Sequence, residues 1–129
     1  MKRDKYDDLF SKLVRARAGW KCERCESGPF PSGYARQGLH NAHLYGRGKG
    51  STRLDFDNCF SLCYGCHRYF DGRKKTAFHP WAREKLGDER YEALVRRGNT
   101  TRRWKPEEKE QLYADMKAEW KTFVEQGLD

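Results

Sequence analysis

Residues 22–25, CERC, and residues 63–66, CYGC, frame the segment of this 129-residue chain that decides its fold. Two CxxC pairs can supply the four thiolates of a tetrahedral structural zinc site. Four thiolates leave no open coordination position, so the site is predicted to be structural rather than catalytic. An iron–sulfur cluster is the minor alternative. The predicted ligands are Cys22, Cys25, Cys63 and Cys66.

The segment between the two pairs is longer than a minimal zinc ribbon requires, and it predicts regular structure. Residues 39–45 predict one strand, and residues 54–62 contain a second. A helix is expected from about residue 66 to Gly72, and residues 27–38, with three glycines and two prolines, predict a loop. The predicted fold class is therefore α+β, with a small ββα core braced by the four-cysteine site and flanked by N- and C-terminal helices.

Three further helices are predicted outside this core. Residues 4–18 have apolar side chains at helical spacing and are followed by Gly19. Residues 79–97 predict a helix with Pro80 at its first position, which would make His79 a helix-start residue. Residues 106–126 predict an amphipathic helix.

The predicted domain organisation is one compact unit with an extension. We expect a zinc-braced domain at residues 1–98, and a linker with a C-terminal helix packed on it at residues 99–129. The apolar face of that helix has to be buried. Packing against the N-terminal helix is the preferred interpretation, and a dimer or a docking site for another protein is the alternative.

The charge of the chain indicates a polyanionic partner. Its formal net charge is +8, and the mean hydropathy is −1.11. The basic excess lies in residues 1–104, which carry 23 Lys and Arg against 12 Asp and Glu, whereas residues 105–129 carry 4 and 7. A basic body of this kind suits nucleic acid.

The sequence indicates a cytoplasmic protein without a membrane partner. The amino-terminal MKRDKYDDLF has no apolar stretch of the signal-peptide type. No run approaches the roughly 18 apolar residues of a membrane span. In a reducing compartment, cysteines favour metal binding over disulfides. The fifth cysteine, Cys59, is expected to be a small buried hydrophobic residue.

Three residues between and after the cysteine pairs have the chemistry of phosphodiester hydrolysis. His43 can act as a general base for water near neutral pH. Asn58 can orient that histidine or tie the loop, as outer-shell partners do. A hard divalent ion can neutralise charge on the phosphate and on the leaving oxygen. His43, Asn58 and His67 therefore carry side chains of the kinds that such a reaction requires.

The stretch AHLYGRGKGSTRLDFDNCFSLCYGCHRYF, residues 42–70, resembles the core of small phage HNH endonucleases, which have the ββα-metal motif. With the flanking CxxC pairs and WAREKLGDERYEAL at residues 81–94, the chain is also similar to the lambdoid NinG recombination-protein group. The resemblance covers about residues 13 to 95. It implies a phage protein acting in the host cytoplasm, with His43 as base, Asn58 as orienting residue and His67 as ligand of a catalytic Mg²⁺ or Mn²⁺.

One position departs from the HNH pattern. Many HNH motifs place a second metal ligand directly before the base, and this chain has Ala42 there. His40 is the nearest possible replacement, because in a strand it points to the same side as residue 42. Asp57 is a weaker candidate. A mostly water-coordinated Mg²⁺ would also be ordinary chemistry.

Basic residues around the motif predict a DNA-contacting surface. Arg47 and Lys49 lie in a glycine-rich loop, Arg53 precedes Asn58, and Arg68 follows His67. Contacts of this kind give affinity for phosphates without reading sequence.

The sequence leaves three functional interpretations. The leading one is a metal-dependent HNH endonuclease that hydrolyses DNA. The alternatives are a non-catalytic zinc DNA-binding module and an assembly factor of a phage packaging or recombination complex. A DNA-binding module has no use for His43 and Asn58, which favours the first interpretation.

Overall fold

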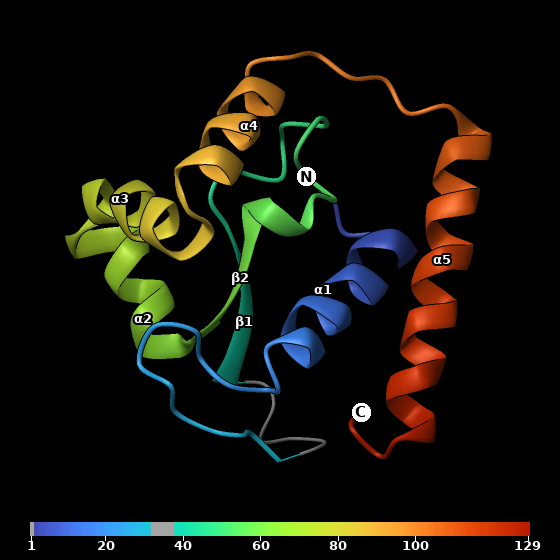
Figure 1. The fold of residues 1–129 in the computed structure, drawn as a ribbon, viewed down its shortest axis with the longest axis horizontal. Coiled ribbons are helices and arrows are strands. Elements are labelled where there is room, and N and C mark those ends of the chain that lie inside the picture. Colours follow the sequence, from blue (N-terminus) through green and yellow to red (C-terminus); the bar gives the residue numbers. More distant parts are fainter. Residues whose placement is uncertain (1, 32–37) are drawn as a thin grey trace.

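A two-stranded antiparallel sheet lies at the centre of the molecule, with helices on both of its faces (Figure 1). The computed structural model describes residues 2–31 and 38–129. Strand β1 (Leu39–His43) pairs with β2 (Cys59–Cys63), and the register sets His43 opposite Cys59. The α+β prediction is confirmed. Most of the loop predicted at residues 27–38, namely residues 32–37, lies outside the described residues.

The two faces of the sheet carry different side chains because successive residues of a strand point to opposite sides. On one face Cys59 packs with Phe10 and Leu13 of helix α1 (Lys5–Arg17). On the other face the ring of Phe60 meets the rings of Phe78 and Trp81. Residues directly opposite in an antiparallel pair share a face. The α1 face therefore carries Leu39, Asn41 and His43, and the other face carries His40 and Ala42.

Helix α1 is well defined at both ends. Asp4 and Asp7 form a reciprocal capping box, with each side chain accepting from the other's backbone N–H at 3.0 Å. After the helix, Gly19 adopts a φ of +67°, a left-handed conformation that glycine takes without a steric penalty. The prediction of a helix over residues 4–18 is confirmed to within one residue at each end.

The chain after β2 differs from the prediction. Helix α2 (Tyr64–Arg68) begins earlier than expected and continues as a π-helical turn, η3 (Tyr69–Arg73). The single helix predicted over residues 79–97 is wrong: α3 (Lys75–Leu86) and α4 (Asp88–Gly98) are separated by Gly87, whose φ is +85°.

Pro80 lies inside α3 rather than at its start. Packing explains this, because the ring of Phe78 stacks on Phe70 with centroids 4.6 Å apart, and Trp81 contacts Phe60. Because these rings pack against the core, the helix begins before the proline. The proline leaves the helix without one backbone N–H donor.

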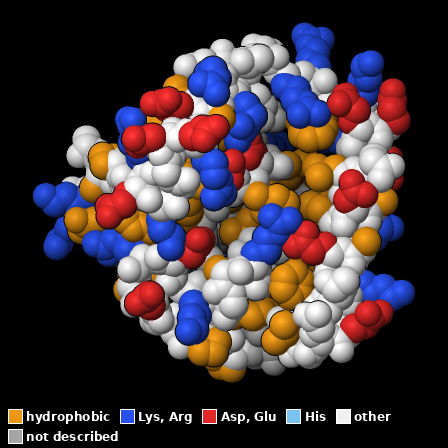
Figure 2. All heavy atoms as spheres, viewed as in Figure 1, with side chains coloured by type: hydrophobic (Ala, Val, Ile, Leu, Met, Phe, Trp, Pro, Cys, Tyr) orange, Lys and Arg blue, Asp and Glu red, His pale blue; other side chains and the backbone are white. Residues whose placement is uncertain are grey.

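Helix α5 (Pro106–Glu125) lies along the outer side of α1 (Figure 1). Figure 2 shows hydrophobic side chains between these helices. Met116 is 3% exposed and packs with Phe10, Leu13 and Val14. Full burial of such a side chain stabilises the fold by about 1.5–3 kcal/mol. Arg17 donates two hydrogen bonds, of 2.7 and 2.6 Å, to Glu119, and Trp20 Nε1 donates to the Leu128 carbonyl at 2.6 Å.

The connection from β1 to β2 ends in a short 3-10 helix, η2 (Phe56–Asn58). Asp55 caps it by accepting from the Asp57 N–H at 3.0 Å. Among the described residues, no helix is long and apolar enough to cross a membrane.

Candidate active site

The four CxxC cysteines form one cluster at the end of the sheet. All four Sγ atoms lie within 4.8 Å of one another, and the Sγ atoms of Cys25 and Cys63 are 3.7 Å apart. A tetrahedral zinc with bonds of about 2.3 Å requires sulfur–sulfur distances of about 3.8 Å. Each CxxC turn also directs a backbone N–H at a thiol, from Cys25 to Cys22 and from Cys66 to Cys63, both at 3.5 Å. The predicted four-cysteine cluster is confirmed, and it could hold a structural metal such as zinc.

Hydrogen bonds and burial shift the pKa values of the cluster cysteines in opposite directions. Hydrogen bonds from the Ser27 side chain and backbone lower the pKa of Cys25 to about 6. Burial raises the pKa of Cys66 to about 12, although Arg24 opposes this with a hydrogen bond of 3.3 Å to its Sγ. Arg24 was not anticipated from the sequence. Its guanidinium brings positive charge next to a centre that four thiolates and a divalent ion would leave at −2.

A second candidate centre is formed by His40 and His67. The Nδ1 atoms of these rings are 2.8 Å apart, and the rings meet edge to face. Two ligands at adjacent corners of an octahedron, each about 2.1 Å from the ion, are about 3 Å apart. The pair therefore fits two positions of a metal shell. Among the described residues, no third His, Cys, Asp or Glu completes this group, so water or substrate oxygens would fill the other positions.

Asp71 supports His67 from the opposite side of its ring. The Asp71 carboxylate lies 3.7 Å from His67 Nε2, within ion-pair range but beyond a direct hydrogen bond. A carboxylate near Nε2 favours a proton there and leaves Nδ1 free to bind a metal. Asp71 was not predicted from the sequence. Its spacing of four residues from His67 on a helix was the signal that could have identified it.

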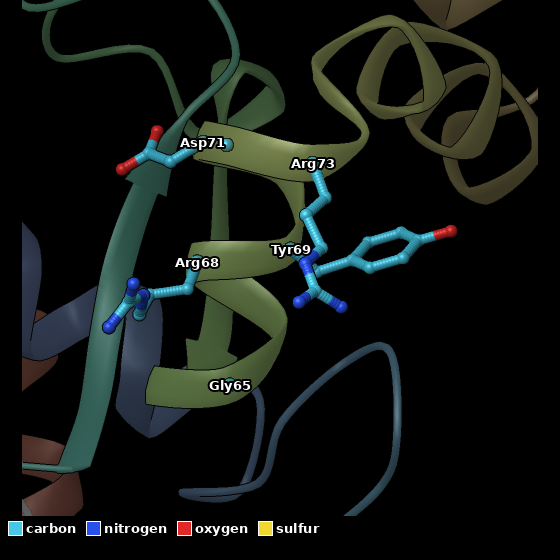
Figure 3. A pocket seen from close by; sticks show the side chains of 6 residues that line it. Gly65, Arg68, Tyr69, Asp71 and Arg73 are labelled. Carbon is cyan, nitrogen blue, oxygen red and sulfur yellow. The ribbon is translucent and has the colours of Figure 1, made fainter.

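A shallow hollow of roughly 620 Å³ lies on α2 and η3; neither histidine lines it, and Asp71 is the residue that it shares with this group. Figure 3 shows that Arg68 and Asp71 extend to one side of the helical segment, whereas Tyr69 and Arg73 extend to the other. Arg68 is exposed, and its Nη1 donates to the Tyr64 hydroxyl at 2.9 Å. The hollow is thus lined by two arginines, Arg68 and Arg73, and by the Asp71 carboxylate.

His43 occupies a more enclosed position. Its Nε2 lies 3.2 Å from the backbone carbonyl of Arg53. A carbonyl oxygen can only accept, so this contact requires the proton on Nε2 and leaves Nδ1 as the basic nitrogen. Burial lowers the pKa of His43; the hydrogen bond to Arg53 opposes this, and the positive charge of Arg47 adds to it. His43 is therefore neutral near pH 7, as a general base must be.

Asn58 holds the loop that supplies this carbonyl. Its side chain is fully buried; Oδ1 accepts from the Tyr45 N–H at 2.7 Å, and Nδ2 donates to the carbonyls of Tyr45 and Thr52 at 2.9 and 3.0 Å. Asn58 therefore fixes both ends of the segment between His43 and Arg53. From the sequence, Asn58 was expected either to orient His43 or to tie the loop. In the structure its side chain ties the loop, and no hydrogen bond to the His43 ring is found among the described contacts.

The structure does not bring His43 and His67 together. His40 and His67 meet on the α2 face of the sheet, whereas His43 lies on the α1 face. The Cα atoms of residues 40 and 43 are about 10 Å apart along an extended strand.

Arg53 is engaged within the fold. Its guanidinium makes two hydrogen bonds to the buried carboxylate of Asp7, the Nε bond being 2.9 Å, and a third to the Lys2 carbonyl at 3.1 Å. The side chain of Arg53 is only 16% exposed. This ion pair removes Arg53 from the DNA-contacting surface predicted from the sequence.

The other predicted DNA contacts lie at the surface. Lys49 is exposed, and its Nζ donates to the Gly98 carbonyl at 2.7 Å. Arg47 is half-buried, and it is near enough to His43 to affect its pKa.

Two further residues singled out in the sequence have partners within the fold. The carboxylate of Asp57, the weaker ligand candidate, pairs with Arg90 and Arg97 at 2.5 and 3.4 Å. His79 does not begin a helix; it lies within α3, where Nδ1 is 2.8 Å from the Tyr91 hydroxyl. Cys59 is 5% exposed, which confirms its burial.

Comparisons with protein-family models, curated proteins and solved structures find no match for this chain.

Proposed function

We propose that this chain is a metal-dependent endonuclease that hydrolyses phosphodiester bonds in DNA. The observation that carries the proposal is the contact between His43 Nε2 and the Arg53 carbonyl. It orients a neutral imidazole with Nδ1 as the available base. A structural histidine has no need of a loop fixed at both ends by a buried asparagine.

In the proposed reaction, His43 Nδ1 accepts a proton from the attacking water. The bond between the water oxygen and phosphorus forms as the bond to the 3′ oxygen breaks. This leaves a 5′-phosphate and a 3′-oxyanion, which takes a proton from solvent water to become the 3′-hydroxyl. His40 and His67 would hold a divalent ion, Mg²⁺ or Mn²⁺, which supplies charge neutralisation at the phosphate and the leaving oxygen. Imidazole nitrogens favour transition-metal ions over Mg²⁺, so Mn²⁺ is the better first probe.

A second candidate function is a non-catalytic zinc module that binds DNA. The separation of His43 from His67 on opposite faces of the sheet favours it, since a module of this kind requires no shared catalytic centre. The third interpretation, a factor docked through the apolar face of α5, has less support because that face packs on α1.

The two candidates differ in one assay. Purified protein is incubated with supercoiled plasmid and Mg²⁺, Mn²⁺ or EDTA, beside His43→Ala. The matched control is His79→Ala, which removes another half-buried histidine that has a hydrogen-bond partner. The endonuclease proposal expects cleavage with Mn²⁺, a loss of about 10²–10⁴-fold in His43→Ala, and little change in His79→Ala. Equal cleavage by both variants would remove His43 from the mechanism, and no cleavage by any form would favour the binding module.

A further inference from the structure

The glycine-rich loop and the linker between α4 and α5 together form a positively charged surface. Residues 46–53 contain three basic side chains and residues 96–105 contain five, and neither segment contains an acidic residue. The segments are far apart in sequence. Figure 2 shows Lys and Arg side chains along the upper rim, where Figure 1 places the end of α4 and the linker.

Three contacts hold these segments against each other. Lys49 Nζ donates to the Gly98 carbonyl at 2.7 Å, and Trp104 Nε1 donates to the Gly50 carbonyl at 3.1 Å. A Cβ atom placed on Gly50 would lie 3.4 Å from the Arg102 carbonyl, so the two backbones are in close contact. The linker is thus fixed on the loop, and its charges have defined positions.

The surface between the segments is concave. One hollow of roughly 270 Å³ is lined by residues 48–51 and 98–102, and a second of roughly 220 Å³ is lined by Ser51, Thr100 and three arginines. Ser51, Thr100 and Arg102 line both hollows, which therefore adjoin. Hydroxyl groups and guanidinium groups are the donors that commonly contact phosphate oxygens.

The arginines of this surface differ in what they already bind. Arg97 is engaged by Asp55 and Asp57. Arg102 pairs with Glu108 at 3.1 Å and stacks on the Trp104 ring, 3.8 Å from its centroid. Arg96 and Arg103 are exposed, and within residues 2–31 and 38–129 neither has an ion-pair partner. A fixed scaffold with unneutralised charges is suited to an external polyanion.

We infer that this loop–linker surface, made of Lys49, Ser51, Arg96, Thr100, Arg102 and Arg103, binds the phosphate backbone of duplex DNA. The choice of DNA as the polyanion rests on the proposed function. The surface continues from the loop that follows His43, so bound DNA would extend from the catalytic segment over the end of α4. The loop–linker surface would contribute affinity for DNA rather than recognition of the base sequence.

The test measures DNA binding separately from cleavage. Affinity for a short labelled duplex is followed by fluorescence anisotropy over a series of salt concentrations, with no divalent ion added. The test variant is Arg96→Gln with Arg103→Gln, because neither side chain has an ion-pair partner that holds the described fold. The matched control is Lys117→Gln with Lys121→Gln, which removes the same charge from exposed positions of α5.

We expect the arginine pair to weaken binding about tenfold and to reduce the slope of log Kd against log salt by about 1.8, since each phosphate contact contributes about 0.9. The lysine pair should change affinity less than threefold. Equal weakening in the two variants would mean that net charge alone matters, and the inference would be overturned.

Cleavage of plasmid with Mn²⁺ is measured in parallel. If the arginine pair loses DNA affinity but the wild type does not cleave plasmid, the endonuclease proposal alone is contradicted. If the wild type cleaves plasmid but the arginine pair binds DNA as tightly as the wild type, this inference alone is contradicted.

Discussion

The cysteine cluster and the histidine pair contain neighbouring residues, Cys66 and His67, but they offer a metal very different surroundings. The cluster supplies four ligands, two of them buried, and no position for substrate. The histidine pair supplies two ligands, and no third His, Cys, Asp or Glu among the described residues completes the group. A saturated centre can contribute only to folding, whereas an unsaturated one can bind water and phosphate oxygens. Consecutive residues on one helix thus belong to two different candidate centres, one with four protein ligands and one with two.

The largest effect is expected from breaking the cysteine cluster. Cys66→Ser should unfold the protein, because structural zinc in small domains contributes about 10–16 kcal/mol of apparent folding free energy. Zinc content and thermal denaturation are the measurements. Cys59→Ala is the matched control, since Cys59 is buried outside the cluster, and it should cost about 1 kcal/mol. Similar melting curves for the two variants would show that the cluster holds no metal in solution.

A smaller loss of stability is expected from the ion pair that supports the His43 segment. Burial tends to raise the pKa of Asp7, but hydrogen bonds from Arg53 and the Asp4 backbone outweigh it and lower the pKa from 3.8 to about 2. A carboxylate with a lowered folded pKa stabilises the fold above its unfolded pKa. That stability is lost as pH falls from about 4 to about 2.

Asp7→Asn should therefore destabilise the protein by about 3 kcal/mol at neutral pH, because it leaves the guanidinium of Arg53 poorly compensated. The difference in the free energy of unfolding between the wild type and Asp7→Asn should shrink by about 2 kcal/mol at acid pH. Denaturant unfolding at pH 7 and near pH 2 measures both values. A difference between the two proteins that does not shrink in acid would contradict the assignment.

The pH dependence of cleavage tests the histidine site at a finer level. Burial lowers the pKa of His43 below 6.5, and the base is active only when neutral. Activity should be constant near pH 7 and fall about tenfold per pH unit once the pH is below that pKa. Single-turnover rates on plasmid give the profile. A midpoint above 6.5 would point to a different base.

The smallest effect is expected at Asp71. Asp71→Asn removes the negative charge near His67 Nε2 but retains a polar side chain of similar size. It should raise the Mn²⁺ concentration needed for half-maximal cleavage about tenfold without changing zinc content. Asp115→Asn on α5 is the matched control, at an exposed position away from the sheet. An unchanged Mn²⁺ requirement would show that Asp71 does not orient the histidine.

Local sequence signals predicted the parts of the fold that depend on local chemistry. The CxxC spacing identified the metal cluster, and apolar periodicity identified α1 and α5. The break at Gly87 and the position of Pro80 inside α3 were not predicted, because the packing of Phe78 and Trp81 on the sheet determines where that helix begins.

The candidate site was predicted in part for the same reason. His40 was proposed as a ligand from strand alternation, and it does meet His67. The ion pair of Arg53 with Asp7 joins residues 46 positions apart, which no spacing rule indicates. The placement of His43 on the opposite face follows from its odd separation from His40, once the strand is taken as continuous.

The central claim is that the chain has two metal centres with different functions, and a Mn²⁺ titration of zinc-loaded protein tests it most directly. Plasmid cleavage is measured against Mn²⁺ concentration for the wild type, His40→Ala, His67→Ala and the control His79→Ala. We expect saturable cleavage by the wild type and by His79→Ala, with unchanged zinc content in all four proteins. The two site variants should require at least about tenfold more Mn²⁺ or lose cleavage. Cleavage that persists in EDTA, or that is equal in all four proteins, would contradict the claim.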